Sequence, residues 1–191
     1  QFWDVRTQQA TGTISGEASD IVELALSARG SLLTTGHKDG AVRLWDAQTR
    51  RLLHRFGSQF GSPVISLAFS PTEPLLAASD QDGNIVLYNT TNMEVLSPPL
   101  KAHTWRVMAL AFSPDGRTLA SAGEGGGLKL WNVATRQVAL TLKGHAGSVC
   151  GIAFSGDGNL LASCGADATV RLWYAATFEQ ADGAARSEEG Q

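Results

Sequence analysis

The sequence has few charged residues, only two cysteines and no long apolar run. Charged residues make up 17% of the 191 residues and the formal net charge is −3, so no positive field exists to attract nucleic acid or an anionic membrane. The apolar runs are far shorter than a bilayer span, which excludes a transmembrane helix. Two cysteines do not make a disulfide framework, which favours a reducing compartment, and we expect the protein to be cytoplasmic.

Helical periodicity is also missing from the repeated part of the chain, where short strand patterns alternate with glycine-rich turns. One twelve-residue phrase occurs four times, each time as strand, turn and strand. Its copies are TGHKDGAVRLWD at 35–46, ASDQDGNIVLYN at 78–89, SAGEGGGLKLWN at 121–132 and SCGADATVRLWY at 163–174. The aromatic residue near the end of each copy, and Trp3 before them, recur every 42 or 43 residues. A fixed period of this length predicts an array of one supersecondary unit.

Each complete unit predicts four antiparallel strands. The first strand reads close to V-x-x-[LI]-A-F-S, apolar on both faces, as expected for a strand with neighbours above and below. Turns such as Ser113-Pro114-Asp115-Gly116 then reverse the chain. The sequence therefore predicts an all-β domain over 1–176. Its parts are a partial unit at 1–20, units at 21–56, 64–97, 106–142 and 148–176, the last without an outer strand, and a tail at 177–191.

Four-stranded repeats that end in Trp-Asp resemble the WD-repeat β-propeller family, and the resemblance covers residues 1 to about 176. The resemblance implies radial four-stranded blades around a central channel, most often seven. It is to the C-terminal part of a bacterial-type WD-repeat protein, so we expect four complete blades and a partial one in an open arc. Because each blade normally covers the apolar face of its neighbour, we expect this chain alone to self-associate or to be marginally stable.

The resemblance also implies a structural tetrad of His, Ser or Thr, Asp and Trp in each blade. Physically, a buried indole must bond its N–H, and a hydroxyl and an imidazole can relay that bond to a carboxylate. The last unit has the full set, whereas Gly125 replaces the Asp of the third, Glu17 stands at the His position of the first, and Phe60 and Ala78 weaken the second. The expected members are His145, Ser163, Asp167 and Trp173; His103, Ser121 and Trp131; Thr35, Asp39 and Trp45; and Asp82 and Tyr88.

Ser, His and Asp together also suggest a hydrolase, but a catalytic triad is needed once per site, whereas this set repeats and degrades with the period of the fold. The four histidines lack paired metal-ligand spacing. The glycine run at 123–127 lies between strands and not before a helix, so it lacks the context of a phosphate loop. We therefore expect no catalytic site, no metal and no cofactor.

What the family resemblance implies about function is a non-catalytic scaffold for protein–protein contacts. Its expected partners are proteins or peptides rather than nucleic acid, membranes or small-molecule substrates. The alternative is a regulatory or sensor module attached to an upstream enzyme, such as the serine/threonine kinase domain that precedes some bacterial relatives.

The loops before each first strand and the turns between the second and third strands should emerge on one face of the ring, here called the loop face. Trp105 stands out there, because the aligned residues Ser19, Ser62 and Gly147 are small. A loop Trp beside an Arg is the pair most enriched at interface hot spots, although a local lid over the adjacent blade is the alternative. The candidate binding residues are Trp105, Arg106, Lys38, Gln81, Glu124 and Asp20.

The two cysteines lie on neighbouring strands. Counting back through the turn at 156–158 places Cys150 opposite Cys164 on one sheet face. We expect two small buried apolar residues, with a disulfide as the less favoured alternative.

Overall fold

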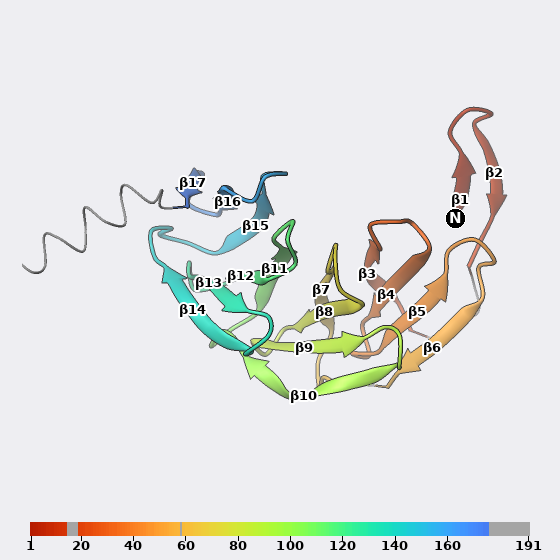
Figure 1. The fold of residues 1–191 in the computed structure, drawn as a ribbon, viewed down its shortest axis with the longest axis horizontal. Coiled ribbons are helices and arrows are strands. Elements are labelled where there is room, and N and C mark those ends of the chain that lie inside the picture. The colour runs from red at the N-terminus through yellow and green to blue at the C-terminus, as the bar shows by residue number, and fades with distance from the viewer. Residues whose placement is uncertain (15–18, 58, 176–191) are drawn as a thin grey trace, which may run out of the picture.

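A computed structural model describes residues 1–14, 19–57 and 59–175, and these form successive antiparallel sheets arranged as an open arc (Figure 1). The first blade contains β3 (Ile21–Leu26), β4 (Leu32–His37), β5 (Val42–Asp46) and β6 (Leu52–Phe56). The second contains β7 (Val64–Phe69), β8 (Leu75–Asp80), β9 (Asn84–Asn89) and β10 (Glu94–Lys101). Each blade is a meander in which sequence neighbours pair.

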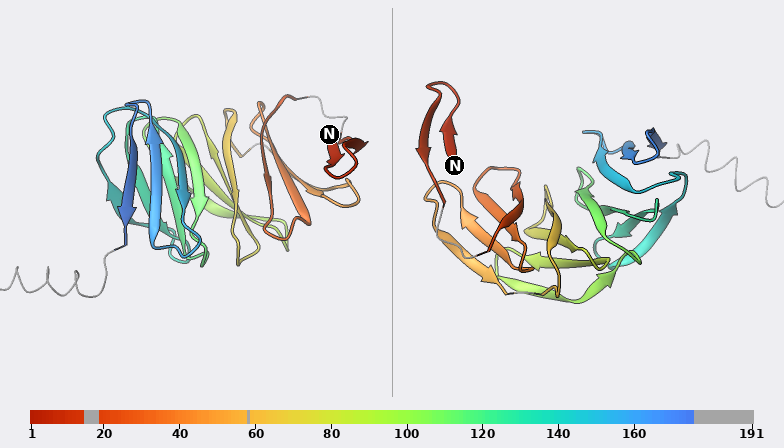
Figure 2. Two further views of the ribbon diagram at one scale, coloured as in Figure 1. Left: turned by 90° about the horizontal axis from the view of Figure 1, so that it is seen from above. Right: turned by 180° about the vertical axis from the view of Figure 1, so that it is seen from behind.

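The third blade contains β11 (Val107–Phe112), β12 (Thr118–Gly123), β13 (Leu128–Asn132) and β14 (Gln137–Leu142). The fourth has three described strands, β15 (Val149–Phe154), β16 (Leu160–Gly165) and β17 (Val170–Tyr174). At the other end of the arc, β1 (Phe2–Asp4) and β2 (Gln9–Gly12) form a separate hairpin (Figure 2). No helix long and apolar enough to cross a membrane occurs in the described ranges.

The second blade extends beyond the boundary expected at residue 97. Its outer strand β10 continues to Lys101, and the register shifts between Leu96 and Leu100. Pro98 and Pro99 cause the interruption, because proline has no N–H to donate to the ladder and is tolerated on an outer strand. Pairing resumes at Leu100, opposite Ile85.

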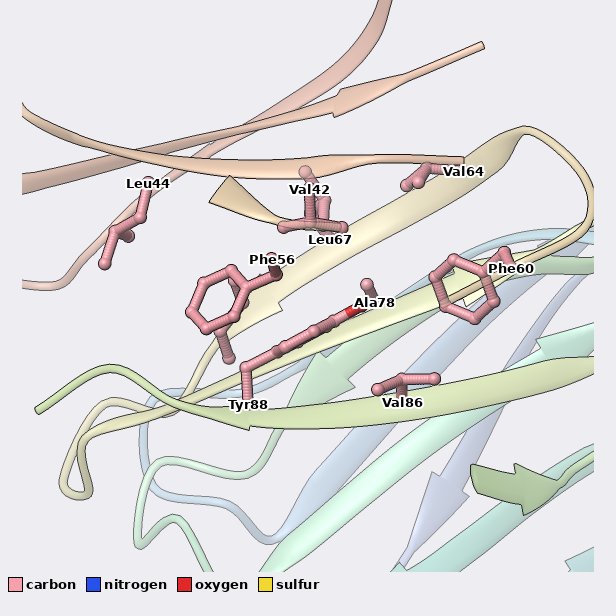
Figure 3. Close-up of a cluster of buried hydrophobic side chains, with 10 residues drawn as sticks. Val42, Leu44, Phe56, Phe60, Val64, Leu67, Ala78, Val86 and Tyr88 are labelled. Carbon is pink, nitrogen blue, oxygen red and sulfur yellow. The ribbon is translucent and has the colours of Figure 1, made fainter. Parts of the chain in front are cut away.

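The core lies between blades, in three buried clusters. The first joins Val42, Leu44 and Phe56 of the first blade to Val64, Leu67 and Tyr88 of the second (Figure 3). Two equivalent clusters join the second blade to the third and the third to the fourth. Each blade therefore completes the core of its neighbour, and the repeated blade-to-blade interface holds the arc together.

Candidate functional site

The fourth blade contains a complete hydrogen-bonded relay. Trp173 Nε1 donates to Ser163 Oγ at 2.9 Å, and that oxygen lies 2.8 Å from His145 Nε2. Because Ser163 Oγ accepts from the indole, its own proton points to Nε2, so His145 carries its proton on Nδ1. Nδ1 lies 3.0 Å from both carboxylate oxygens of Asp167. This contact, with the N–H of Ala146, holds the pKa of Asp167 well below its usual range.

The third blade repeats the relay without the carboxylate. Trp131 Nε1 donates to Ser121 Oγ at 3.0 Å, and Ser121 Oγ lies 2.9 Å from His103 Nε2. Gly125 stands where the fourth blade has Asp167. Burial, with the nearby charge of Lys129, lowers the pKa of His103 to about 4. The imidazole is therefore neutral at physiological pH.

The first blade has a relay whose histidine the sequence analysis did not identify. Trp45 Nε1 donates to Thr35 Oγ1 at 2.9 Å, and the same oxygen lies 2.9 Å from Nε2 of His37. His37 is fully buried, and its Nδ1 lies 3.2 Å from the carbonyl oxygen of Ser19. Glu17, which aligns with the loop histidines, lies outside the described residues. Asp39 faces Arg43, with 3.8 Å between Oδ2 and the guanidinium.

The second blade fills the same space with apolar groups. Phe60, Ala78 and Tyr88 are all buried. The hydroxyl of Tyr88 has no hydrogen-bond partner among the described residues, and burial, with the charge of Asp80, raises the pKa of Tyr88. Asp82 lies exposed in the turn, where its N–H donates to Asp80.

One backbone position accounts for these differences. It lies two residues after the relay hydroxyl, at the end of the second strand of each blade. A Cβ at Gly123 or Gly165 would meet Nδ1 of the loop histidine, so glycine leaves room for that ring. In the two blades without a loop histidine the position carries a buried polar side chain, His37 or Asp80. A glycine at this position, together with a histidine in the preceding loop, therefore predicts that the imidazole comes from the loop. A histidine at this position, as at His37, predicts that the imidazole comes from the second strand.

The loop face is held by backbone hydrogen bonds at the same place in three blades. The first residue of the turn after the second strand donates to the carbonyl of the residue before the first strand. The pairs are Lys38 to Asp20 at 3.0 Å, Glu124 to Arg106 at 3.0 Å and Ala166 to Ser148 at 2.8 Å. The six candidate binding residues therefore lie on loops and turns of one face. Lys38 and Asp20 also approach each other through their side chains, at 3.9 Å.

Trp105 is the large exposed side chain of this face. Its relative exposure is 63%, so it does not form a lid over the adjacent blade. The loop that carries it lies on the second blade, where Gly83 has a φ of +84° and a Cβ would meet the carbonyl oxygens of His103 and Trp105. Ala102 and His103 also donate their N–H groups to the carbonyl of Gly83. Contacts with the second and third blades thus fix the backbone that carries the indole of Trp105.

Two family models match the chain, and each matches a different part. The model described as WD domain, G-beta repeat matches residues 8–46 and 136–174, and the model described as the anaphase-promoting complex subunit 4 WD40 domain matches residues 67–150. The chain belongs to the WD-repeat β-propeller family. A comparison with curated proteins found no match.

Solved structures show the same propeller architecture. A chain of the "Crystal Structure of Mitotic Checkpoint Complex" superposes with a TM-score of 0.82 at 22% identity, over 90% of this chain and 53% of that chain. This WD-repeat chain therefore spans about half the length of that chain, and the likeness concerns the fold alone. Because 1502 solved chains match, the fold by itself does not single out a partner.

Members of the WD-repeat family generally serve as interaction platforms and are generally not enzymes. The relay of the fourth blade agrees with a structural role. Ser163 is 2% exposed and its oxygen accepts from Trp173, so a substrate cannot reach it. Within the described residues, no group of three or more His, Cys, Asp or Glu side chains could hold a metal ion.

The expected environment of the cysteines was wrong. Both are free and exposed rather than buried. Cys164 pairs with Gly151 in the same register as Phe154–Leu161 and Ala153–Ala162 next to the turn, and Cys150 lies in a bulge between Val149 and Gly151 and has no opposite residue. The first strands of all four blades carry this bulge, at Val22, Ile65, Met108 and Cys150.

Proposed function

We propose that this chain is a non-catalytic scaffold that binds a protein partner through its loop face, with Trp105 and Arg106 as the anchor. The observation that carries the proposal is the exposed indole of Trp105. The aligned residues of the other blades are Ser19, Ser62 and Gly147, so the blade does not need an indole at this position. A large aromatic side chain that is mostly exposed and stands on a fixed backbone is suited to binding, because little entropy is lost when a partner covers it.

Arg106 supports the same reading. Its backbone carbonyl is bonded to the N–H of Glu124, so its position is fixed. The guanidinium makes no ion pair with the described residues, and its buried Nε has no hydrogen-bond partner among them. Because the described residues leave its charge unpaired, the guanidinium of Arg106 can pair with a carboxylate of a partner, although its buried Nε would not take part.

Four polar side chains surround this anchor as the rim of the surface. The ion pair between Lys38 and Asp20 is long and both side chains are mostly exposed, so it contributes little to stability and can be exchanged for contacts with a partner. Gln81 and Glu124 are exposed in the equivalent turns of the second and third blades. We expect these four residues to tune partner choice and association rate more than affinity.

The test is partner capture with immobilised wild-type chain, Trp105→Ala and Trp3→Ala. Trp3 is a matched control, since it is also an exposed tryptophan (58%) but lies in the N-terminal hairpin. Proteins retained by the wild type and by Trp3→Ala but lost by Trp105→Ala, with an unchanged melting temperature, support the proposal. Equal capture by all three proteins, or a melting temperature lowered by Trp105→Ala, contradicts it.

A further inference from the structure

The turn between the second and third strands follows the same backbone course in the third and fourth blades. In each blade the N–H of the third turn residue donates to the carbonyl of the glycine that ends the second strand, at 3.3 Å and 3.1 Å. The third turn residues are Gly126 and Ala168, and both have a positive φ, of 80° and 59°. The two turns differ in the middle residue, which is Gly125 in the third blade and Asp167 in the fourth.

In the fourth blade the carboxylate of Asp167 accepts from four donors. Nδ1 of His145 lies 3.0 Å from both carboxylate oxygens, and the N–H of Ala146 donates at 3.0 Å. Thr169 donates through its N–H at 3.2 Å and through its hydroxyl at 2.8 Å. Three of these donors, the imidazole and two backbone N–H groups, have aligned counterparts in the third blade, at His103, Thr104 and Gly127.

The three counterparts have no acceptor among the described residues. Ser121 Oγ accepts from the indole and donates to Nε2 of His103, so His103 carries its proton on Nδ1. That N–H makes no hydrogen bond with the described residues, and neither do the backbone N–H groups of Thr104 and Gly127. A Cβ at Gly125 would meet nothing within 4 Å, so the space next to this turn position is open.

The other blades each supply a carboxylate to the N–H that aligns with that of Gly127. The pairs are Ala41 to Asp39 at 3.1 Å, Asn84 to Asp80 at 2.7 Å and Thr169 to Asp167 at 3.2 Å. Asp80 ends the second strand, whereas Asp39 and Asp167 lie in the middle of the turn, so different sequence positions bring a carboxylate to the same N–H. Among the described blades, the third presents these donors without a carboxylate of its own.

The surroundings of these donors are compatible with an anion. Lys129 lies close by, since burial and then the charge of Lys129 lower the pKa of His103. The carboxylate of Glu124 does not fill the site, because its side chain is exposed and makes no hydrogen bond with the described residues. Thr104 directly precedes Trp105, so the free donors and the exposed indole stand on one loop.

We propose that these donors bind a carboxylate of the partner protein, from the side chain of an Asp or Glu residue. The inference rests on the proposed function, which places a partner over Trp105. The carboxylate accepts from Nδ1 of His103 and from the N–H groups of Thr104 and Gly127, as Asp167 accepts in the fourth blade. The partner thus completes the relay of the third blade from outside. Because hydrogen bonds to an ionised acceptor are about twice as strong as neutral ones, an acidic residue is preferred over its amide.

The first experiment titrates sodium acetate, the simplest carboxylate probe, into the purified chain and records NMR spectra. The N–H signals of Thr104 and Gly127 and the Nδ1 signal of His103 should shift and saturate, whereas sodium chloride at the same ionic strength should leave them unchanged. The aligned N–H groups that already bond a carboxylate are internal controls and should not shift; they belong to Ala41, Asn84 and Thr169. No saturable shift in the third blade, equal shifts in all four blades, or an equal response to chloride overturns the proposal.

The second experiment fills the site from within the chain. Gly125→Asp should weaken acetate binding more than about tenfold, because its own carboxylate competes for the same donors. Gly125→Ala is the matched control. Since Gly125 has no positive φ and a Cβ there lies in open space, this variant should bind acetate as the wild type does. Circular dichroism verifies that both variants are folded. Equal acetate affinities of the two variants overturn the proposal.

Partner capture with the same variants separates this inference from the proposed function. A protein retained by the wild type and by Gly125→Ala but lost by Gly125→Asp supports the docked carboxylate, provided that acetate binds as expected. A protein lost by Trp105→Ala but retained by Gly125→Asp upholds the proposed function and overturns the docked carboxylate. A protein retained by Trp105→Ala but lost by Gly125→Asp does the reverse.

Discussion

The fourth and second blades fill the same space in opposite ways. In the fourth blade an indole, a hydroxyl, an imidazole and a carboxylate form a continuous relay. In the second blade Phe60, Ala78 and Tyr88 fill it with carbon, and the hydroxyl of Tyr88 has no partner among the described residues. The aromatic residue of the third strand is fully buried in the second blade and partly buried in the fourth, so both blades fill this space. The polar relay is needed only where the aromatic residue brings an N–H that must be bonded.

The first and third blades lie between these extremes. Both bond the indole through a hydroxyl and an imidazole, but the imidazole comes from the second strand in the first blade and from the preceding loop in the third. Different backbone positions thus deliver the same ring to the same place.

The largest effect is expected when the apolar filling of the second blade is removed. Phe60→Ala deletes a ring that is 4% exposed and should lower the free energy of unfolding by about 3–5 kcal/mol. Urea denaturation measures the change. The control Val138→Ala, on an exposed position of β14, should stay within about 0.5 kcal/mol. A loss for Phe60→Ala no larger than that of the control would show that the second blade does not depend on its apolar filling.

The glycine of the third blade should be coupled to its loop histidine. Gly123→Ala brings a Cβ against Nδ1 of His103 and should cost about 1–3 kcal/mol of stability through overpacking. In a His103→Ala background the same change should cost less than about 0.5 kcal/mol, because the ring is gone. A double-mutant cycle measures the difference. Equal costs in both backgrounds would show that Gly123 and His103 are not energetically coupled.

The third blade can be converted towards the fourth by restoring its carboxylate. Gly125 has open space around it, so Gly125→Asp should place an acceptor near Nδ1 of His103 and stabilise the protein by about 0.5–1.5 kcal/mol. The wild-type pKa of His103 is about 4, below the ordinary 6.5, so the unfolded chain binds more protons between these values and stability falls as pH drops through that window. The new carboxylate should raise this pKa and reduce that fall. An NMR titration of His103 identical in both proteins would contradict the expectation.

The smallest effect concerns the unbonded hydroxyl of the second blade. Tyr88→Phe removes a buried oxygen without a described partner, so stability should be unchanged or rise by up to about 1 kcal/mol. Chemical denaturation measures the change in the free energy of unfolding and its sign. A loss above about 1 kcal/mol would show that the hydroxyl is bonded in solution.

The blade architecture could be predicted because the period fixes it. A phrase repeated every 42 or 43 residues with an aromatic residue at the same place allows few other folds. The relay residues of the third and fourth blades were also predictable, since the loop histidine and the strand hydroxyl keep their spacing. The sequence does not show which backbone position supplies the imidazole of each relay. His37 was missed because the relay histidine was expected only in the loop before the first strand.

The cysteine pairing failed for a different reason. A bulge inserts one residue into each first strand, and the bulged residues Val22, Ile65, Met108 and Cys150 include no glycine or proline that would reveal it. The bulge leaves Cys150 without an opposite residue, and the pairs next to the turn centre it between Asp157 and Gly158, so a count centred on Asp157 gives a register that is wrong by one. Burial was misjudged because the face of the fourth blade that carries Cys164 has no described neighbour.

The Trp105 loop packs against Gly83 of the second blade, and this contact affects how such a repeat array can change by gene duplication. A loop histidine and the glycine that makes room for it lie in one 43-residue unit, so a duplicated gene segment inherits both together. Gly83 and the loop at 103–105 lie in different units. Moving the third unit alone to another place in the array would preserve its relay but would place the Trp105 loop against a different neighbouring blade. The proposed binding surface would therefore be inherited only with pairs of adjacent units.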